Sequence, residues 1–243
     1  MSSISVITAT FNSEKVIGGL IDSLVSQTDK EFDWIVADGG STDSTLDIIN
    51  SYTDDICISL IEGPDFGIYD AINKAVQKSN SEFYIVVGSD DKLNSNSIYN
   101  FRNSVDDKVS IITAYPERAR LIKRFRNKFD AFSPMRKYIH GHSVYTCFRR
   151  SLHGKYGLYS RRFPIAADLL FIRKCVLGGE LVKSCDFDPG FFSSEGVSNA
   201  DQLGVLTETM RVQVETGVSE WSAVLVFLLR LCWSKVRSFD IFK

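Results

Sequence analysis

The chain has 243 residues, enough for one large domain or two small ones. Its content of 44% hydrophobic and 24% charged residues is typical of globular proteins, and a net charge of -2 argues against nucleic-acid binding by bulk charge. Five scattered cysteines without a C-x-x-C pair indicate neither a disulfide framework nor a zinc site, which favours a reducing cytoplasm. The N-terminus enters a strand pattern directly and lacks the regions of a signal peptide.

The first ninety residues alternate between strand and helix patterns. Asn12 or Ser13 is the expected N-cap of the first helix. Four such alternations predict an α/β protein with a doubly wound, mostly parallel sheet flanked by helices. Strands are expected at 4–10, 32–40, 56–63 and 82–91, and helices at 12–28, 41–52 and 66–79.

The second half has weaker patterns. Strands are expected at 109–117 and 143–150, and a helix at 166–179. Residues 118–137 are rich in Arg and Lys with interleaved Phe and Leu, and residues 221–233 form an apolar run near the C-terminus.

The stretch FYIVVGSDDKL, residues 83–93, ends an apolar strand in two adjacent carboxylates, Asp90 and Asp91. One interpretation is a solvated turn, because Asp and Ser favour turns. The other is a cation site, because Mg²⁺ and Mn²⁺ prefer oxygen ligands and are held by one or two carboxylates together with substrate phosphates. Ligands of open α/β sheets bind beyond the carboxyl ends of the strands, where this pair is expected.

Other carboxylates follow the remaining strands. Asp38 ends the second strand and Asp65 follows the third, so both are expected at the same edge as Asp90 and Asp91. Each alone is also compatible with an N-cap or turn residue. The chain has no G-x-G-x-x-G after its first strand, which disfavours a dinucleotide fold, and no G-x-x-x-x-G-K-[ST], which excludes a P-loop.

Residues 5–45, SVITATFNSEKVIGGLIDSLVSQTDKEFDWIVADGGSTDST, resemble the opening of the family 2 glycosyltransferases, inverting enzymes of the GT-A fold. EGPDFGIYDAINKAV, residues 62–76, resembles the bacterial polysaccharide branch of that family, of colanic acid and O-antigen type. The resemblance implies that Asp38 contacts uracil. It also implies that Asp91, with Asp90 beside it, holds Mn²⁺ or Mg²⁺ on the donor diphosphate. Further residues expected to bind the nucleotide donor are Thr8, Thr10, Asn12, Asp65 and Asp70.

The downstream resemblance is looser. FPIAADLLFIRKC resembles the family segment whose Asp is the general base, here Asp168, although Asp168 could equally begin a helix. GHSVYTCFRR resembles an acceptor-side segment with a His after Gly, here His142, with His140 two residues earlier. Either His could instead be a surface or packing residue. FFSSEGVSNA resembles an acceptor-side loop that carries G-G-V-S in relatives, with Glu195 replacing the first Gly.

The expected protein is a single glycosyltransferase domain over 1–243, with a nucleotide-sugar-binding half at 1–110 and a smaller acceptor-side half at 111–243 that ends in an apolar helix. Its expected activity is metal-dependent, inverting transfer from a nucleotide sugar, UDP-linked, to a hydroxyl of a glycan or undecaprenyl-linked acceptor in bacterial surface polysaccharide synthesis. The alternatives are a sugar-nucleotide nucleotidyltransferase and a non-catalytic sugar-nucleotide-binding subunit.

The apolar run 221–233 is too short to span a bilayer, which needs about 20 residues. It is compatible with a buried core helix or with a helix at a membrane surface. The basic stretch 118–137 could add attraction to anionic lipid, or could be a solvated charged face. The expected location is the cytoplasm, with peripheral contact at the inner face of the cytoplasmic membrane.

Overall fold

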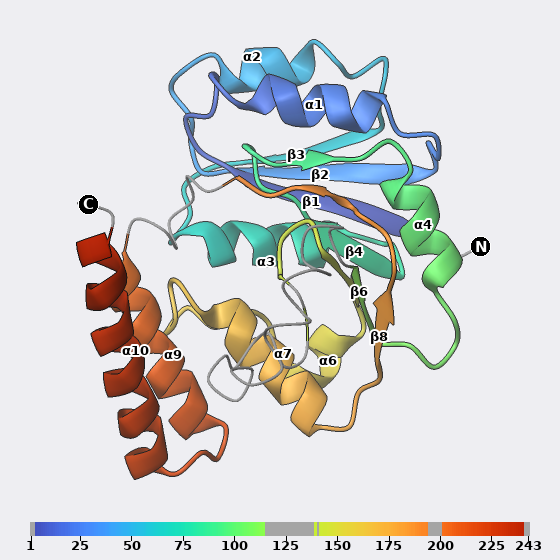
Figure 1. Cartoon of the computed structure of the whole chain (residues 1–243). Helices are drawn as coiled ribbons and strands as arrows, with labels where there is room; N and C mark the ends of the chain where they lie inside the picture. Colours follow the sequence, from blue (N-terminus) through green and yellow to red (C-terminus); the bar gives the residue numbers. More distant parts are fainter. Residues whose placement is uncertain (1–2, 115–138, 140, 194–200, 241–243) are drawn as a thin grey trace.

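The computed structural model describes residues 3–114, 139, 141–193 and 201–240, with side chains described up to residue 232. Its centre is a seven-stranded sheet of order β3-β2-β1-β4-β7-β6-β8 (Figure 1). A second, two-stranded sheet pairs β5 with β9. The strands are β1 Ile4–Thr10, β2 Phe32–Asp38, β3 Ile58–Glu62, β4 Phe83–Val86, β5 Lys92–Leu93, β6 Ile111–Ala114, β7 Thr146–Arg149, β8 Val182–Cys185 and β9 Gly190–Phe191.

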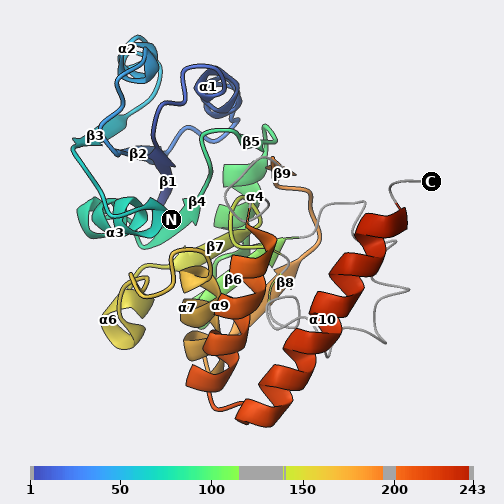
Figure 2. The same cartoon turned by 90° about the vertical axis from the view of Figure 1, so that its left-hand side faces the viewer.

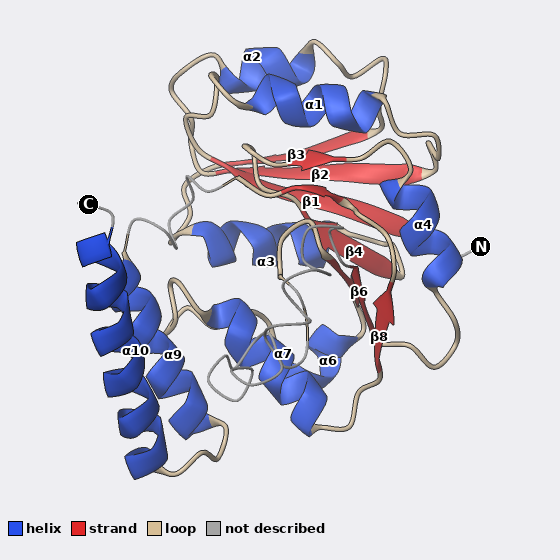
Figure 3. Ribbon diagram, in the orientation of Figure 1, coloured by secondary structure: helices blue, strands red, loops and turns tan. Residues whose placement is uncertain are grey.

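Helices cover both faces of the large sheet (Figure 3). One apolar core joins the sheet to α1, α2 and α4, and the other joins it to α3, α6 and α7. The described helices are α1 Ile17–Val25, α2 Thr45–Asn50, α3 Ile68–Lys78, α4 Ser97–Ser104, α6 Leu152–Tyr156, α7 Ala167–Leu177, α9 Gln202–Glu215 and α10 Glu220–Asp240.

The side chains of each central strand point alternately to the two faces of the sheet and so contribute to both apolar cores. In β2, Trp34 and Val36 face the α1 side, whereas Ile35 and Ala37 face the α3 side. Successive side chains of a strand point to opposite faces, so a strand covered on both sides must be apolar at nearly every position. This requirement explains the continuous apolar runs in the first ninety residues.

The order and direction of the strands confirm the predicted doubly wound sheet. β3, β2, β1 and β4 are parallel, and β6 is parallel to β8. The strand β7 lies between β4 and β6 and is antiparallel to both. The register pairs Thr10 with Asp38 and Asp38 with Glu62, so the carboxyl ends of these strands form one edge.

The first helix begins later than expected. Its N-cap is Val16, with no side-chain cap, so the expected cap at Asn12 or Ser13 is wrong. Asn12 instead has a φ of +48°, and its side-chain oxygen accepts a hydrogen bond from Thr42 N at 2.9 Å. The loop after β1 is therefore tied to the loop after β2.

The C-terminal helix α10 is longer than the apolar run and packs against α9, side by side in both views (Figure 2). Trp221 is 86% exposed and Leu225 59%, whereas Ala223 is buried, so the alternative of a core helix is wrong for the described part of this run. Among the described residues, no helix is both long enough and apolar enough to cross a membrane. The basic stretch 118–137 lies outside the described residues.

The small β5–β9 sheet joins the segment after Asp91 to the segment before Ser193. Gly190 has a φ of +150°, and a Cβ on it would lie 2.1 Å from the carbonyl oxygen of Lys92. Only glycine allows this close approach of the two backbones.

We predict that Gly190→Ala lowers the free energy of unfolding by at least about 2 kcal/mol, because the methyl group would have to displace a backbone carbonyl. Gly18→Ala is the matched control: it lies in α1 with no atom within 4 Å of its added methyl, so a gain of up to about 1 kcal/mol is expected. Urea unfolding of both variants measures the difference. Equal stabilities would contradict the proposed clash.

Candidate active site

Polar side chains gather at the carboxyl edge of the parallel strands. Thr10 ends β1, Asp38 ends β2, and Asp90 and Asp91 follow β4 on the other side of β1. Ser13 Oγ donates to Ser89 Oγ at 3.0 Å, which joins the loops after β1 and β4. Within the described ranges, no three His, Cys, Asp or Glu side chains group closely enough to hold a metal ion. The expected carboxylates therefore share one edge without forming one cluster.

Asp38 is buried and organises the turn that follows β2. Its Oδ2 accepts hydrogen bonds from Gly40 N at 2.9 Å and Ser41 N at 2.8 Å, and its Oδ1 accepts from Ser41 Oγ. A carboxylate oxygen has two lone pairs, so Oδ1 can still accept one further hydrogen bond. The turn thus holds the carboxylate in a fixed orientation with one acceptor position left.

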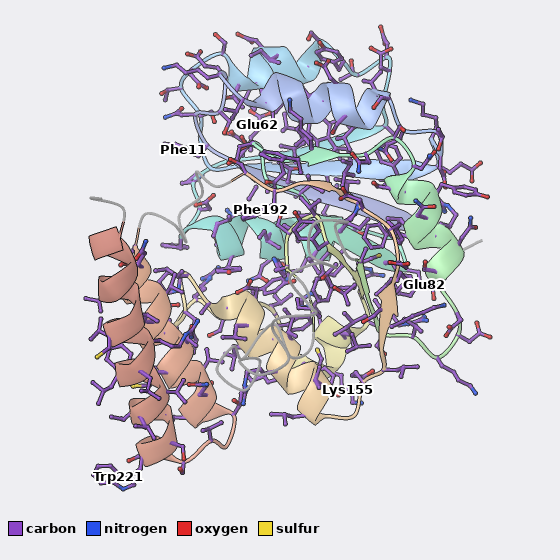
Figure 4. The ribbon with its side chains drawn as sticks, in the orientation of Figure 1. Phe11, Glu62, Glu82, Lys155, Phe192 and Trp221 are labelled. Atoms are coloured by element: carbon purple, nitrogen blue, oxygen red, sulfur yellow. The ribbon has the colours of Figure 1, made fainter. Side chains whose placement is uncertain are left out.

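Asp65 and Phe11 lie next to this turn. A Cβ on Gly39 would lie 2.7 Å from Asp65 Oδ2 and 3.6 Å from Phe11 Cδ2, so both side chains close over the glycine. Phe11 is 61% exposed, and Figure 4 shows it at the sheet edge. Phe11 was not anticipated from the sequence. The available signal was a large apolar residue placed directly after a buried strand, where a polar loop residue is usual.

The other expected donor-side residues of β1 have structural partners. Thr8 is wholly buried, and its Oγ1 accepts from Trp34 Nε1 at 3.0 Å, so it lies inside the sheet rather than at the site surface. Thr10 Oγ1 is buried and has no hydrogen-bond partner among the described residues. Asn12 shapes the adjoining loop through Thr42, and its N–H donates to Ser41 Oγ at 2.8 Å.

Asp91 is almost completely buried and accepts three hydrogen bonds. Gly88 N at 2.9 Å and Ser143 Oγ at 2.7 Å donate to Oδ2, and Ser193 N at 2.8 Å donates to Oδ1. Burial raises the pKa of Asp91, and these hydrogen bonds only partly oppose that shift. Within the described ranges, no group donates a hydrogen bond to the neighbouring Asp90, which is partly exposed. Ser143 and Ser193 were not anticipated from the sequence.

Asp70, an expected donor-side residue, is paired within the protein. Its carboxylate forms an ion pair with Arg161, lies 3.5 Å from Lys74 Nζ, and accepts from Phe66 N at 3.3 Å. Burial raises the pKa of Asp70, but the hydrogen bonds from Phe66 and Arg161 outweigh burial, so the net shift is downward. The Arg161 guanidinium lies 5.1 Å from the centre of the exposed Phe66 ring. The buried carboxylate therefore orients a cation at the surface.

Asp168 lies in the first turn of α7. Its Oδ2 is 3.9 Å from His142 Nδ1, so two residues that the sequence pattern placed on the acceptor side come together. Burial lowers the pKa of His142, and the nearby charge of Asp168 opposes that shift. Glu195 and His140 lie outside the described residues.

The start of α7 is held from a distant part of the chain. Glu208 of α9 is buried, and its Oε2 accepts hydrogen bonds from Ile165 N at 3.0 Å and Ala166 N at 2.8 Å. This carboxylate satisfies two backbone donors that the helix itself leaves unpaired. The position of Asp168 therefore depends on α9, a dependence that no local pattern reveals.

Several known proteins match this chain in sequence. Residues 5–162 match the family described as glycosyl transferase family 2. The chain is 30% identical over 183 residues to a PGL/p-HBAD biosynthesis glycosyltransferase of Mycobacterium bovis, covering 73% of this chain and 71% of that protein. It is 34% identical over 114 residues to the poly(ribitol-phosphate) beta-N-acetylglucosaminyltransferase TarS of Staphylococcus aureus, covering 45% of this chain and 20% of that protein.

Solved structures share the fold. S. aureus TarS 1-349 in complex with UDP-GlcNAc superimposes with a TM-score of 0.69 at 21% identity, over 93% of this chain and 70% of that one. The mannosyltransferase PcManGT from Pyrobaculum calidifontis, in complex with GDP-Man and Mn²⁺, has a TM-score of 0.71 at 15% identity, over 97% and 75%. These two proteins carry different nucleotides, so the shared fold leaves the base of the donor undetermined.

Proposed function

We propose, since the chain belongs to glycosyl transferase family 2, that it moves a sugar from a UDP-linked donor, with inversion, to a hydroxyl of a glycan or lipid-linked glycan of a bacterial surface polysaccharide. The observation that carries this proposal is the pair of buried, oriented carboxylates, Asp38 and Asp91, on either side of the carboxyl end of β1. The family match disfavours the two alternatives, a nucleotidyltransferase and a non-catalytic binding subunit.

The nucleoside would occupy the edge near Asp38. The remaining acceptor position on Asp38 Oδ1 suits the N3–H group of uracil. Phe11 offers an exposed aromatic face beside it, and aromatic faces stack on nucleobases. Asp65, next to Gly39, is placed at the rim of the same site.

The donor diphosphate would lie on the other side of β1, near Asp90 and Asp91. Asp91 Oδ1 has one acceptor position left and Asp90 is unpaired within the described residues, so the two carboxylates fit a Mn²⁺ or Mg²⁺ ion that takes its other ligands from phosphate and water. Such an ion, when bound, would stabilise the charge that develops on the departing diphosphate.

Asp168 would be the general base. An inverting transfer requires the acceptor hydroxyl to lose its proton as its oxygen attacks the anomeric carbon, and a positioned carboxylate accepts such a proton. Asp168 sits at a helix start that Glu208 anchors, and a rigid backbone of this kind maintains the geometry that the reaction needs. No covalent intermediate with the protein is required.

We propose that the protein binds a lipid-linked acceptor at the membrane surface. Trp221, Val224, Leu225, Leu228 and Leu229 are exposed and recur on one stripe of α10, the pattern of a helix that lies at a lipid interface. Figure 4 shows Trp221 at the end of the α9–α10 pair, away from the sheet. The sequence adds Lys235 and Arg237 farther along, and cations of this kind favour anionic lipid.

We predict that Asp168→Asn lowers transfer by roughly a hundredfold or more while UDP affinity stays unchanged, because the amide keeps the shape of the carboxylate but cannot accept the proton. Release of UDP from a panel of UDP-sugars with candidate acceptors measures transfer, and calorimetry measures UDP binding. Asp201→Asn is the matched control: Asp201 is the N-cap of α9, and Asn caps equally well. Transfer by Asp168→Asn within a few fold of wild type would place the base elsewhere.

We predict that UDP binds about tenfold or more tightly than CDP, because uracil N3 donates to Asp38 whereas cytosine N3 presents a lone pair. In Asp38→Asn the amide oxygen still accepts from Gly40 and Ser41, and the amide nitrogen can instead donate to cytosine. The preference for UDP over CDP should therefore shrink or reverse. Calorimetry with UDP and CDP tests this, and an unchanged preference in the variant would exclude Asp38 as the residue that recognises the base.

We predict that Asp91→Ala loses Mn²⁺ binding in the presence of UDP. It should also lower the free energy of unfolding by about 1–3 kcal/mol, because three donors lose their buried acceptor. Electron paramagnetic resonance of free Mn²⁺ and urea unfolding measure the two effects. Asp107→Ala, an exposed carboxylate in a turn, should change neither. Wild-type Mn²⁺ affinity in Asp91→Ala would refute the metal assignment.

We predict that the wild-type protein co-sediments with phosphatidylglycerol vesicles and that the double variant Leu225→Glu, Leu228→Glu binds them at least about tenfold more weakly, because two apolar contacts become charged. Leu181→Glu is the matched control, since Leu181 is 52% exposed directly before β8 and lies off this helix. Equal binding by all three proteins would mean that α10 does not contact lipid.

A further inference from the structure

A row of hydrogen-bonded side chains, with Tyr84 and Tyr159 at its buried centre and the partly exposed His142 and His153 on either side, runs inward from Asp168. His142 Nε2 lies 2.9 Å from Tyr159 Oη, and Tyr159 Oη lies 2.7 Å from Tyr84 Oη. Tyr84 Oη lies 2.7 Å from His153 Nε2, and His153 Nδ1 lies 3.1 Å from the carbonyl oxygen of Gly157. Four titratable side chains from separate segments thus connect the candidate base to one backbone carbonyl.

The carbonyl oxygen of Gly157 determines which atom is the donor in every hydrogen bond of this row. A carbonyl oxygen only accepts, so His153 carries its proton on Nδ1. Burial lowers the pKa of His153 to about 4, so the ring is neutral at neutral pH and its Nε2 accepts from Tyr84. Each hydroxyl has one proton to donate, so Tyr159 donates to Tyr84. Tyr159 must then accept from His142, which places the proton of neutral His142 on Nε2.

This direction leaves His142 Nδ1 without a proton where it faces Asp168. At 3.9 Å, the lone pair of Nδ1 and the carboxylate Oδ2 face each other with no proton between them. The other titratable groups nearby are tyrosines and His153. The Tyr69 hydroxyl of α3 donates to the carbonyl oxygen of Ile165 at 3.0 Å and also lies within hydrogen-bonding range of the Asp168 carboxylate, and Tyr159 lies against His142. Burial raises the pKa of both tyrosines, so they are uncharged at neutral pH. One proton placed between these two atoms would therefore link Asp168 to His142.

We propose that His142 is a positioning residue that shares with Asp168 the proton taken from the acceptor hydroxyl, and that the hydrogen-bonded row holds His142 in the tautomer this sharing requires. The inference rests on the proposed role of Asp168 as the base. The acceptor O–H bond breaks as its oxygen bonds to the anomeric carbon, and the bond from that carbon to the diphosphate oxygen breaks with its electron pair. The proton goes to the Asp168–His142 pair and passes to water after the products leave.

The tautomers can be measured without any activity. The chain has three histidines, so ¹⁵N-labelled histidine gives few signals, and single His→Gln variants assign them. At pH 8, long-range ¹H–¹⁵N spectra should show His142 protonated on Nε2 and His153 protonated on Nδ1. Protonation of His142 on Nδ1, or the same tautomer in His142 and His153, would overturn the inference.

The kinetic test uses the dependence of kcat on pH. In His142→Gln the pair loses its nitrogen acceptor and holds its proton less tightly. The acid limb of the profile should therefore move to lower pH by about one unit, and the plateau should fall by about tenfold. A merely structural role would lower the plateau without moving the limb. Tyr159→Phe provides a second variant: it removes the acceptor of the Nε2 proton and should move the limb in the same direction.

The variant Asp168→Asn distinguishes a failure of the proposed base from a failure of the inference about His142. If this variant keeps transfer, the proposed base is wrong and the inference falls with it. If it loses transfer while the acid limb stays in place in both His142→Gln and Tyr159→Phe, only the inference about His142 is overturned. Unchanged UDP affinity in each variant shows that the donor site remains folded.

Discussion

The sheet is covered by helices on both faces, and this constraint decides where polar chemistry can occur. A polar group inside the covered sheet must find a partner there, as Thr8 does with Trp34 and as Ser5 does with Ser79 and Ser81. Side chains that meet a ligand are therefore restricted to the strand ends. The parallel register of β1 with β2 and β4 brings those ends to one edge, where Asp38 and Asp91 lie.

The carboxylates at this edge differ in how tightly the protein holds them. Asp38 and Asp91 each accept three hydrogen bonds from nearby donors, so their orientation is set before any ligand arrives. Asp70 is neutralised by Arg161 and acts through that cation. Asp168 is held through its backbone, because Glu208 binds the start of α7. Its Oδ1 accepts a hydrogen bond from Leu169 N at 2.7 Å, and its Oδ2 faces His142.

Several groups around Asp91 and Asp168 come from segments in the second half of the chain. β7 enters antiparallel between β4 and β6, and its approach places Ser143 on Asp91 and His142 beside Asp168. The β5–β9 pairing brings Ser193 to the opposite oxygen of Asp91. Asp91 therefore joins the loop after β4 to two segments from the second half of the chain.

The sequence by itself determined the alternating strands and helices of the first ninety residues, the edge on which Asp38 and Asp91 lie, and the helix whose first turn contains Asp168. These follow from local apolar periodicity and from the geometry of parallel strands. Only the tertiary structure decided that Thr8 is internal, that Asp70 is paired with Arg161, and that Phe11 flanks the turn at Asp38. The described part of the apolar run 221–233 is likewise largely exposed, with Ala223 buried. The physical reason is that each of these outcomes depends on contacts or burial set by residues far away in the chain, which no local pattern encodes.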